Sequence, residues 1–264
     1  MAEKDYVAIA KRKIQRPAEV NRAPNFHIYA RNKKGKTTFG MSAGVEKTLI
    51  IDPEHGTDAM KAKNPHVWPI EVWSDIDDAY NYLRSGKHPY EWVVVDGLTR
   101  LSNMSLKHVM RVQEERDLTR TPGFVQKQDY GKAGELMKTM LTSFYNLPQG
   151  VIYTSQERMQ EGFDSEEDED LESGGAEFVP DLPKGVRGYV NSLVEVIGRL
   201  YVVKVDDPKN EGETKPQRRL WVGQSVKYDT GYRADFVLPD MIRMPTIPKL
   251  VSLMETGAVP KKRS

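Results

Sequence analysis

The fold of this chain is decided by one stretch of sequence, His27-Ile28-Tyr29-Ala30-Arg31-Asn32-Lys33-Lys34-Gly35-Lys36-Thr37-Thr38-Phe39-Gly40. Its first residues are typical of a buried strand, and Gly-Lys-Thr-Thr is typical of a loop that opens into a helix. Such a loop points backbone N–H groups at phosphate oxygens, while a lysine reaches the β- and γ-phosphates and a threonine hydroxyl holds Mg²⁺. The stretch therefore predicts a phosphate-binding loop. The alternative is a basic turn that caps a helix.

Within this loop, Lys36 is the predicted phosphate ligand and Thr37 the predicted Mg²⁺ ligand. The other predicted nucleotide-binding residues are Arg31, Asn32, Lys33, Lys34, Gly35 and Thr38. The usual motif begins with glycine where this chain has Ala30, and alanine tolerates unusual backbone conformations less well than glycine. This departure weakens nucleotide affinity, or else the loop lysines strengthen the phosphate contacts, and both readings stay open.

The composition sets limits on the class of protein. A chain of 264 residues can form one large α/β domain with a sizeable core. No apolar run is long enough to cross a bilayer, and the N-terminus lacks the apolar segment of a secretory signal, so we expect a cytoplasmic protein. Cysteine is absent, which excludes disulfides and thiolate chemistry. The net charge is +1, so any nucleic-acid surface must be a local patch.

Short apolar runs alternate with helical patterns along the chain. Strands are predicted at residues 26–30, 48–52, 67–72, 92–96 and 150–155, and helices at 75–84, 101–115, 130–145 and 248–255. Apolar strands separated by helices favour a mostly parallel sheet that is covered on both faces. Residues 194–205 and 218–225, joined by a polar turn, favour an antiparallel hairpin at one edge of this sheet.

The predicted domain organisation has three parts. Residues 1–25 form an N-terminal arm, residues 26–235 the core domain, and residues 236–264 a C-terminal helix with a basic tail. Two flexible loops are expected inside the core, at about residues 116–129 and 157–180.

Asp96 provides a second sign of nucleotide chemistry. It ends an apolar strand sixty residues after Lys36. A nucleotide-hydrolysing enzyme needs a carboxylate at the tip of a strand beside the phosphate loop, where it faces Mg²⁺ through water. A strand that ends in aspartate is common, but together with Gly-Lys-Thr it indicates binding of ATP and Mg²⁺.

Three segments resemble RecA-type recombinases and lie in the order of that family. Residues 50–58 read Ile-Ile-Asp-Pro-Glu-His-Gly-Thr-Asp and resemble the strand that delivers a water-activating glutamate. Residues 94–99 (Val-Val-Asp-Gly-Leu-Thr) resemble the Walker B strand, and residues 151–159 (Val-Ile-Tyr-Thr-Ser-Gln-Glu-Arg-Met) resemble the strand whose glutamine senses the γ-phosphate. The similarity covers roughly residues 25–235 and is greatest to the RecA-like ATPases of bacteriophages, including single-strand annealing and recombination proteins.

This resemblance implies a RecA-like P-loop NTPase fold with a mostly parallel central sheet and an antiparallel edge near the C-terminus. It makes Glu54 the catalytic base and Gln156 the γ-phosphate sensor, beside the catalytic Lys36. The alternatives are a surface glutamate in a turn and a strand-end amide with a local hydrogen bond.

The resemblance also implies contacts with other molecules. The two loops are the expected contacts with single-stranded DNA, through Arg158, Phe163 and Phe124. An acidic run at residues 164–172 opposes such binding, because it repels phosphates. Lys227 and Arg233 resemble the cations that oligomeric RecA-like ATPases present to a neighbouring subunit, although both residues can also be simply solvated.

The sequence therefore favours a Mg²⁺-dependent ATPase that forms a ring or filament and acts on single-stranded DNA in phage recombination or replication, by annealing or strand exchange. We expect it in the cytoplasm of the host cell. One alternative is a nucleotide-dependent assembly or regulatory module that does not act on DNA. Another is an α/β protein whose phosphate loop is vestigial.

Overall fold

The computed structural model describes residues 5–16, 22–160, 177–208, 210 and 212–260. Its strands are β1 (Phe26–Ala30), β2 (Thr48–Asp52), β3 (His66–Pro69), β4 (Trp92–Asp96), β5 (Gly150–Gln160), β6 (Glu177–Pro180), β7 (Val196–Asp206), β8 (Thr214–Trp221), β9 (Gly231–Tyr232) and β10 (Met241–Arg243). Its α-helices are α1 (Tyr6–Lys13), α2 (Lys36–Gly40), α3 (Ser74–Arg84), α4 (Leu98–Arg116), α5 (Lys127–Tyr145), α6 (Lys184–Leu193) and α7 (Ile247–Thr256). Two 3-10 turns, Met41–Ala43 and Val45–Lys47, follow α2.

One sheet organises the molecule, and its strand order is β10-β8-β7-β1-β5-β4-β2-β3. The strands from β7 to β3 along this order are parallel to their neighbours, whereas β8 and β10 are antiparallel and form one edge. β6 pairs with the end of β5, and β9 pairs with the start of β7. The fold class expected from the sequence is therefore confirmed, including the antiparallel edge near the C-terminus.

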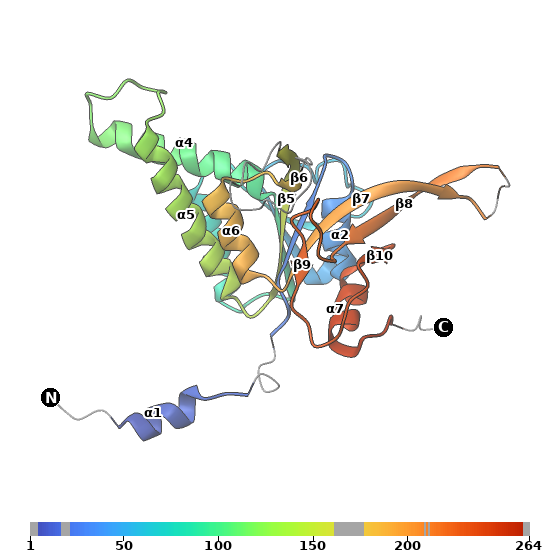
Figure 1. Cartoon of the computed structure of the whole chain (residues 1–264). Coiled ribbons are helices and arrows are strands. Elements are labelled where there is room, and N and C mark those ends of the chain that lie inside the picture. Colours follow the sequence, from blue (N-terminus) through green and yellow to red (C-terminus); the bar gives the residue numbers. More distant parts are fainter. Residues whose placement is uncertain (1–4, 17–21, 161–176, 209, 211, 261–264) are drawn as a thin grey trace, which may run out of the picture.

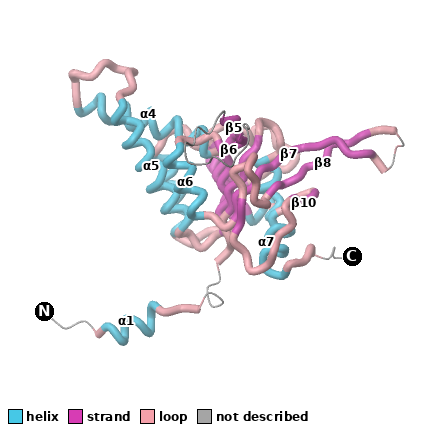
Figure 2. Tube along the Cα trace, in the orientation of Figure 1, coloured by secondary structure: helices cyan, strands magenta, loops and turns pink. Residues whose placement is uncertain are grey.

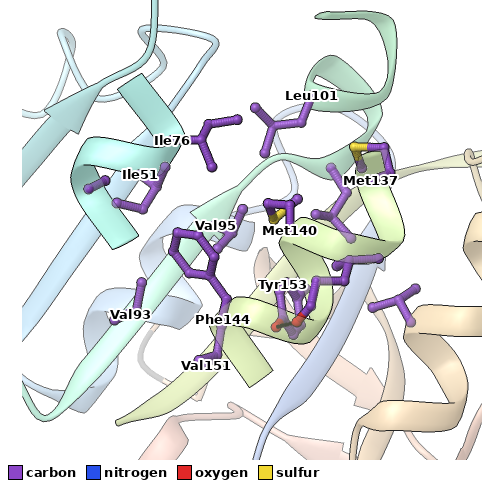
Figure 3. Close-up of a cluster of buried hydrophobic side chains, with 14 of the residues drawn as sticks. Ile51, Ile76, Val93, Val95, Leu101, Met137, Met140, Phe144, Val151 and Tyr153 are labelled. Carbon is purple, nitrogen blue, oxygen red and sulfur yellow. Dashed lines mark hydrogen bonds between the residues drawn. The ribbon is translucent and has the colours of Figure 1, made fainter. Parts of the chain in front are cut away.

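Helices cover both faces of the sheet (Figure 1, Figure 2). On one face, α3, α4, α5 and α6 pack over alternate strand residues such as Val93, Val95 and Tyr153, as Figure 3 shows for part of this cluster. On the other face, α2 and α7 pack over the intervening residues, among them Val94 and Ile152. Since neighbouring residues of a strand point to opposite faces, a strand buried on both faces reads as a continuous apolar run.

The boundaries of several elements differ from the sequence prediction. The predicted hairpin is confirmed, but β8 begins at Thr214, so the turn after β7 is shorter than expected. The loop predicted at residues 116–129 is also shorter, because α4 continues to Arg116 and a capping box between Gln126 and Asp129 starts α5 at Lys127.

The expected loop at residues 157–180 is partly β structure. β5 continues to Gln160, and its last four residues pair antiparallel with β6. The acidic run at residues 164–172 lies outside the described residues. Helix α6 was not predicted, since Gly185 and Gly188 interrupt its apolar pattern. Among the described residues, no helix combines the length and apolar character that a membrane span requires.

His27 is a buried histidine in β1 that links two elements of the core. Its Nδ1 lies 2.8 Å from Asn191 Oδ1 and its Nε2 lies 2.9 Å from Ser155 Oγ. An amide oxygen only accepts hydrogen bonds, so Nδ1 donates to Asn191 and the neutral ring accepts from Ser155. Burial lowers the pKa of His27 from 6.5 to about 4, while the hydrogen bond to Asn191 acts in the opposite direction.

This pKa predicts a loss of stability in mild acid. Between pH 6.5 and 4 the unfolded chain binds a proton at this position and the folded chain does not, so stability falls as the pH falls. From pH 7.5 to 5 the His27 contribution should drop by about 2 kcal/mol. Urea unfolding at both pH values should show a smaller pH dependence for His27→Gln than for the unaltered chain. His66→Gln, at a more exposed histidine, is the control, and equal pH dependence in all three proteins would contradict the prediction.

Candidate active site

The predicted phosphate loop connects β1 to α2 at the carboxyl edge of the parallel strands. All five residues of β1 are buried, and Ala30 packs in the core at the end of the strand. The left-handed backbone conformations lie further along the loop, at Lys33 with φ 60° and at Gly35 with φ 93°. The expectation that Ala30 has to adopt a backbone conformation suited to glycine is therefore wrong, because this position is an ordinary strand residue. Gly35 occupies a conformation that favours glycine.

Asp96 is held at the tip of β4 by two hydroxyl groups. Thr37 of α2 donates to Asp96 Oδ2, and Thr154 of β5 donates to Asp96 Oδ1. Asp96 and Thr154 are direct partners in the parallel pairing of β4 with β5. The structure thus brings the two predicted Mg²⁺ ligands, Thr37 and Asp96, into contact. Sequence reasoning missed Thr154, since its place beside Asp96 depends on the strand order.

Lys36 lies among carboxylates at this edge. Its Nζ donates to the carbonyl oxygen of Ala30 at 3.3 Å. Burial lowers the pKa of Lys36, while the negative charges of Asp96, Glu54 and Glu157 act in the opposite direction. Burial removes part of the hydration shell of the Lys36 ammonium group, and a bound anion can take the place of the lost water. Lys36 therefore suits the role of a phosphate ligand.

Glu54 follows β2 in a turn that Asp52 organises. The buried carboxylate of Asp52 accepts from the backbone N–H groups of Glu54 at 3.0 Å, Gly56 at 3.3 Å and Thr57 at 3.0 Å, and from the Thr57 hydroxyl at 2.6 Å. These hydrogen bonds fix the backbone of the turn, and with it the backbone position of Glu54. Sequence reasoning gave Asp52 no role, although an aspartate followed by polar turn residues is a recognisable turn signal.

The Glu54 carboxylate, which follows β2, meets the side chain of Gln156 on β5, although β4 lies between these two strands in the sheet. Glu54 as a whole is exposed, but burial of its carboxyl end raises its pKa, as does the charge of Asp96. Lys36 and a hydrogen bond from the Gln156 side chain act in the opposite direction. Thr99 fixes the backbone of Gln156, because the Thr99 hydroxyl accepts a hydrogen bond from the Gln156 N–H at 3.0 Å. The structure therefore brings Glu54, Gln156, Asp96 and Lys36 together.

Ion pairs around the buried carboxylate of Glu157 join the phosphate loop to β7. The Glu157 carboxylate, 2% exposed, accepts from Arg199 Nε at 2.6 Å and from Arg31 Nε at 3.3 Å. The Arg199 guanidinium also stacks over the ring of Phe178, 4.6 Å from its centroid. Arg31, a predicted nucleotide ligand, is thus paired with a carboxylate of this chain. Asn32 and Lys33 are exposed, while Lys34, Gly35 and Thr38 are half-buried.

The residues expected to contact DNA do not lie together. Arg158 is half-exposed on β5 and pairs with Asp181 at 3.9 Å. Phe124 is 67% exposed in the connection between α4 and α5, which Figure 1 places at the far end of the helical layer. Phe163 lies outside the described residues.

The two cations expected to act on a neighbouring subunit have different surroundings. Arg233 Nη2 donates to the carbonyl oxygens of Ser192, Leu193 and Val194 at 3.3, 3.2 and 2.9 Å. It therefore caps the C-terminal end of α6, where carbonyl groups lack helical partners. Lys227 is exposed, and its backbone carbonyl accepts from the N–H of Phe178 in β6. Of the two, Lys227 has its charge available to another molecule.

Three comparisons relate this chain to known proteins. A family model described as an AAA domain matches residues 22–234. A search of curated proteins gives no match. Among solved structures, the chain is similar to a KaiC-like protein of the hyperthermophilic archaeon Pyrococcus horikoshii, with a TM-score of 0.42 and 10% identity over 84% of this chain and 89% of that chain.

Proposed function

We propose that this chain, which belongs to the AAA domain family, is an ATPase whose nucleotide state is coupled to single-stranded DNA. Family membership makes it a nucleotide-binding ATPase of the P-loop type. One observation carries the assignment of roles. Lys36, Asp96, Glu54 and Gln156, which come from four separate segments, meet at the carboxyl edge of the sheet, beside the phosphate loop. In parallel α/β sheets, ligands bind at this edge.

The residues at this edge fit Mg²⁺. The Thr37 hydroxyl and the Asp96 carboxylate touch each other, so two oxygen donors are available in one place. In nucleotide sites Mg²⁺ takes one or two protein ligands and completes its shell with phosphates and water. Thr37 and Asp96 would hold the ion, and Thr154 would fix the Asp96 carboxylate from the other side. When bound, Mg²⁺ neutralises charge that develops on the phosphate groups.

The side chains of this chain then divide the work of hydrolysis. Lys36 binds the β- and γ-phosphates. Glu54 accepts a proton from a water molecule as the water oxygen bonds to the γ-phosphorus, and the bond to the β–γ bridging oxygen breaks to release ADP. A raised pKa suits a general base, because proton transfer is most efficient when the pKa of the base is near the working pH. Gln156, which is hydrogen-bonded to Glu54, detects whether the γ-phosphate is present.

The proposed coupling to DNA rests on the position of Arg158 and on the resemblance to RecA-type recombinases. Arg158 lies two residues after Gln156 on β5, so both side chains point to the same face of the strand. A shift of Gln156 that follows the γ-phosphate would move Arg158 with it. Figure 1 shows the paired ends of β5 and β6 beside the start of α4, at the edge that carries the phosphate loop.

Binding to an oligothymidylate in the presence of Mg²⁺ and a non-hydrolysable ATP analogue tests this proposal. The affinity should fall as salt rises, with a slope of about 0.7 per phosphate contact for single strands. Arg158→Ala should bind more weakly and lower that slope by about one contact. Arg111→Ala, which removes an exposed arginine of α4, should bind like the unaltered chain.

Absence of salt-dependent binding in the unaltered chain would contradict the DNA assignment. It would favour the second candidate, a nucleotide-dependent assembly module that does not act on DNA. One observation supports that candidate: two cations near the site, Arg31 and Arg158, are already paired with carboxylates of the same chain. In this case Lys227 would face the nucleotide of a neighbouring copy, and nucleotide would change the mass of the assembly in solution.

A further inference from the structure

Arg218 lies against the phosphate loop and has no part in the site described above. The side chain of Arg218 on β8 covers Gly35. A Cβ atom at Gly35 would lie 3.2 Å from Arg218 Cδ, 3.3 Å from its Nη1 and 3.4 Å from its Cζ. Gly35 therefore provides the φ of 93° that the loop requires and also the space in which this guanidinium rests.

The pairing of the strands explains why Arg218 reaches the loop. β1 pairs with β7 only as far as Tyr29 opposite Arg199, so β7 and β8 continue beyond the end of β1. In this overhang Arg218 lies opposite Val202 in the strand pairing. This pair lies two residues beyond the buried pair of Leu200 and Leu220. Side chains two residues apart share a face, so Arg218 extends the face that α2 and α7 cover. That face carries the phosphate loop.

The charge of Arg218 is uncompensated within the part of the chain that the structure describes. Arg199 is bound to Glu157, and the Arg219 guanidinium donates to the Gln217 side chain at 3.3 Å. No hydrogen bond or ion pair to another described residue is found for the Arg218 guanidinium. An unpaired guanidinium that rests on the backbone of a phosphate loop is placed to bind an anion in that loop.

The direction from which Arg218 approaches indicates which part of the anion it would bind. Asp96, Glu54 and Gln156 lie on the side of the loop towards β5, β4 and β2, whereas Arg218 comes from β8 on the opposite side. If the γ-phosphate faces Glu54 and Gln156, the rest of the nucleotide leaves the loop towards β7 and β8. On the β7 side of the loop lies a hollow of about 310 Å³, lined by Arg31, Lys34, Glu157 and residues 199–202 of β7; Arg218 lies outside this lining.

We propose that Arg218 binds, within the same chain, the diphosphate group that ADP and ATP share. This inference rests on the proposed function and adds a ligand that the phosphate-loop motif does not contain. It assigns Arg218 a contact with the nucleotide in its own subunit, in contrast to the contact expected from Lys227. Since the diphosphate is common to both nucleotides, Arg218 should contribute equally to the affinity for each.

Titration of ADP and of a non-hydrolysable ATP analogue into the purified chain tests the proposal. Arg218→Ala should weaken the binding of both nucleotides by about ten- to a hundredfold, the range of a charge-assisted hydrogen bond, and by the same factor. Arg218→Lys keeps the charge but loses the planar fork, so its nucleotide affinity should lie between those of the unaltered chain and Arg218→Ala. Arg219→Ala is the matched control, because it removes an arginine from the neighbouring position on the other face of β8 and should bind normally.

The outcomes separate this inference from the proposed function. If the unaltered chain binds neither nucleotide, the proposed function fails and the inference fails with it. If the unaltered chain binds both and Arg218→Ala binds them equally well, only the inference is overturned. A loss confined to the ATP analogue would also overturn it, because Arg218 would then act on the γ-phosphate. The thermal unfolding midpoint of Arg218→Ala should match that of Arg219→Ala. Equal midpoints would show that the loss of nucleotide affinity does not come from a loss of folding.

Discussion

Replacement of Lys36 by alanine should abolish ATP turnover while the protein stays folded. The Lys36 ammonium group is partly desolvated and faces the carboxylates of Asp96, Glu54 and Glu157. A triphosphate brings further negative charge to this edge, so the loss of Lys36 removes a cation that offsets the charge of both the carboxylates and the phosphates. The variant should lose most of its affinity for ATP as well as its turnover.

The fold should survive because Lys36 contributes little to the core. Among the described residues, its side chain has one hydrogen bond, to the carbonyl oxygen of Ala30. Phosphate release and the thermal unfolding midpoint are the two measurements. Lys47→Ala, which removes an exposed lysine paired with Glu91, is the control for the loss of a positive charge. Turnover retained by Lys36→Ala would sink the phosphate-loop assignment. No turnover in the unaltered chain would instead favour a vestigial loop.

The sequence predicted the parts of this site that depend on one segment at a time. The phosphate loop, Asp96 at the end of its strand and Glu54 after the second strand can each be recognised from local apolar runs and the residues that follow them. Chain order then places strand ends at one edge of a parallel sheet. For this reason the fold class and the main cluster were predictable without the structure.

Other parts depend on which strands are neighbours and could not be predicted. Thr154 bonds to Asp96 only because β5 lies next to β4, with these two residues in register. Arg218 reaches Gly35 only because β8 starts at Thr214 and extends past β1. The Glu157 carboxylate is buried by arginines from the loop and from β7, which lie 126 and 42 residues away in sequence. Pairing of this kind is fixed by the whole sheet and not by any local pattern.

Replacement of Glu54 by glutamine should leave ATP binding almost normal and slow hydrolysis by at least about a hundredfold, the scale for removal of a general base. Glutamine has the same shape and can keep the hydrogen bond with Gln156, but its amide cannot accept the proton from water. Single-turnover hydrolysis and nucleotide affinity, measured on the same sample, separate the two effects. Glu71→Gln, at an exposed glutamate that pairs with His55 after β3, is the matched control.

The pH dependence gives this prediction a second, independent readout. Burial of the carboxyl group and the charge of Asp96 raise the pKa of Glu54 above the ordinary value of 4.5. The base form is lost as the pH falls through that raised pKa, so the hydrolysis rate of the unaltered chain should begin to fall at a higher pH than an exposed glutamate would give. Glu54→Gln has no carboxyl group at this position, so its slow residual rate should lack this acid limb, while Glu71→Gln should retain it. An unchanged hydrolysis rate in Glu54→Gln, or the same acid limb in all three proteins, would place the general base on another residue.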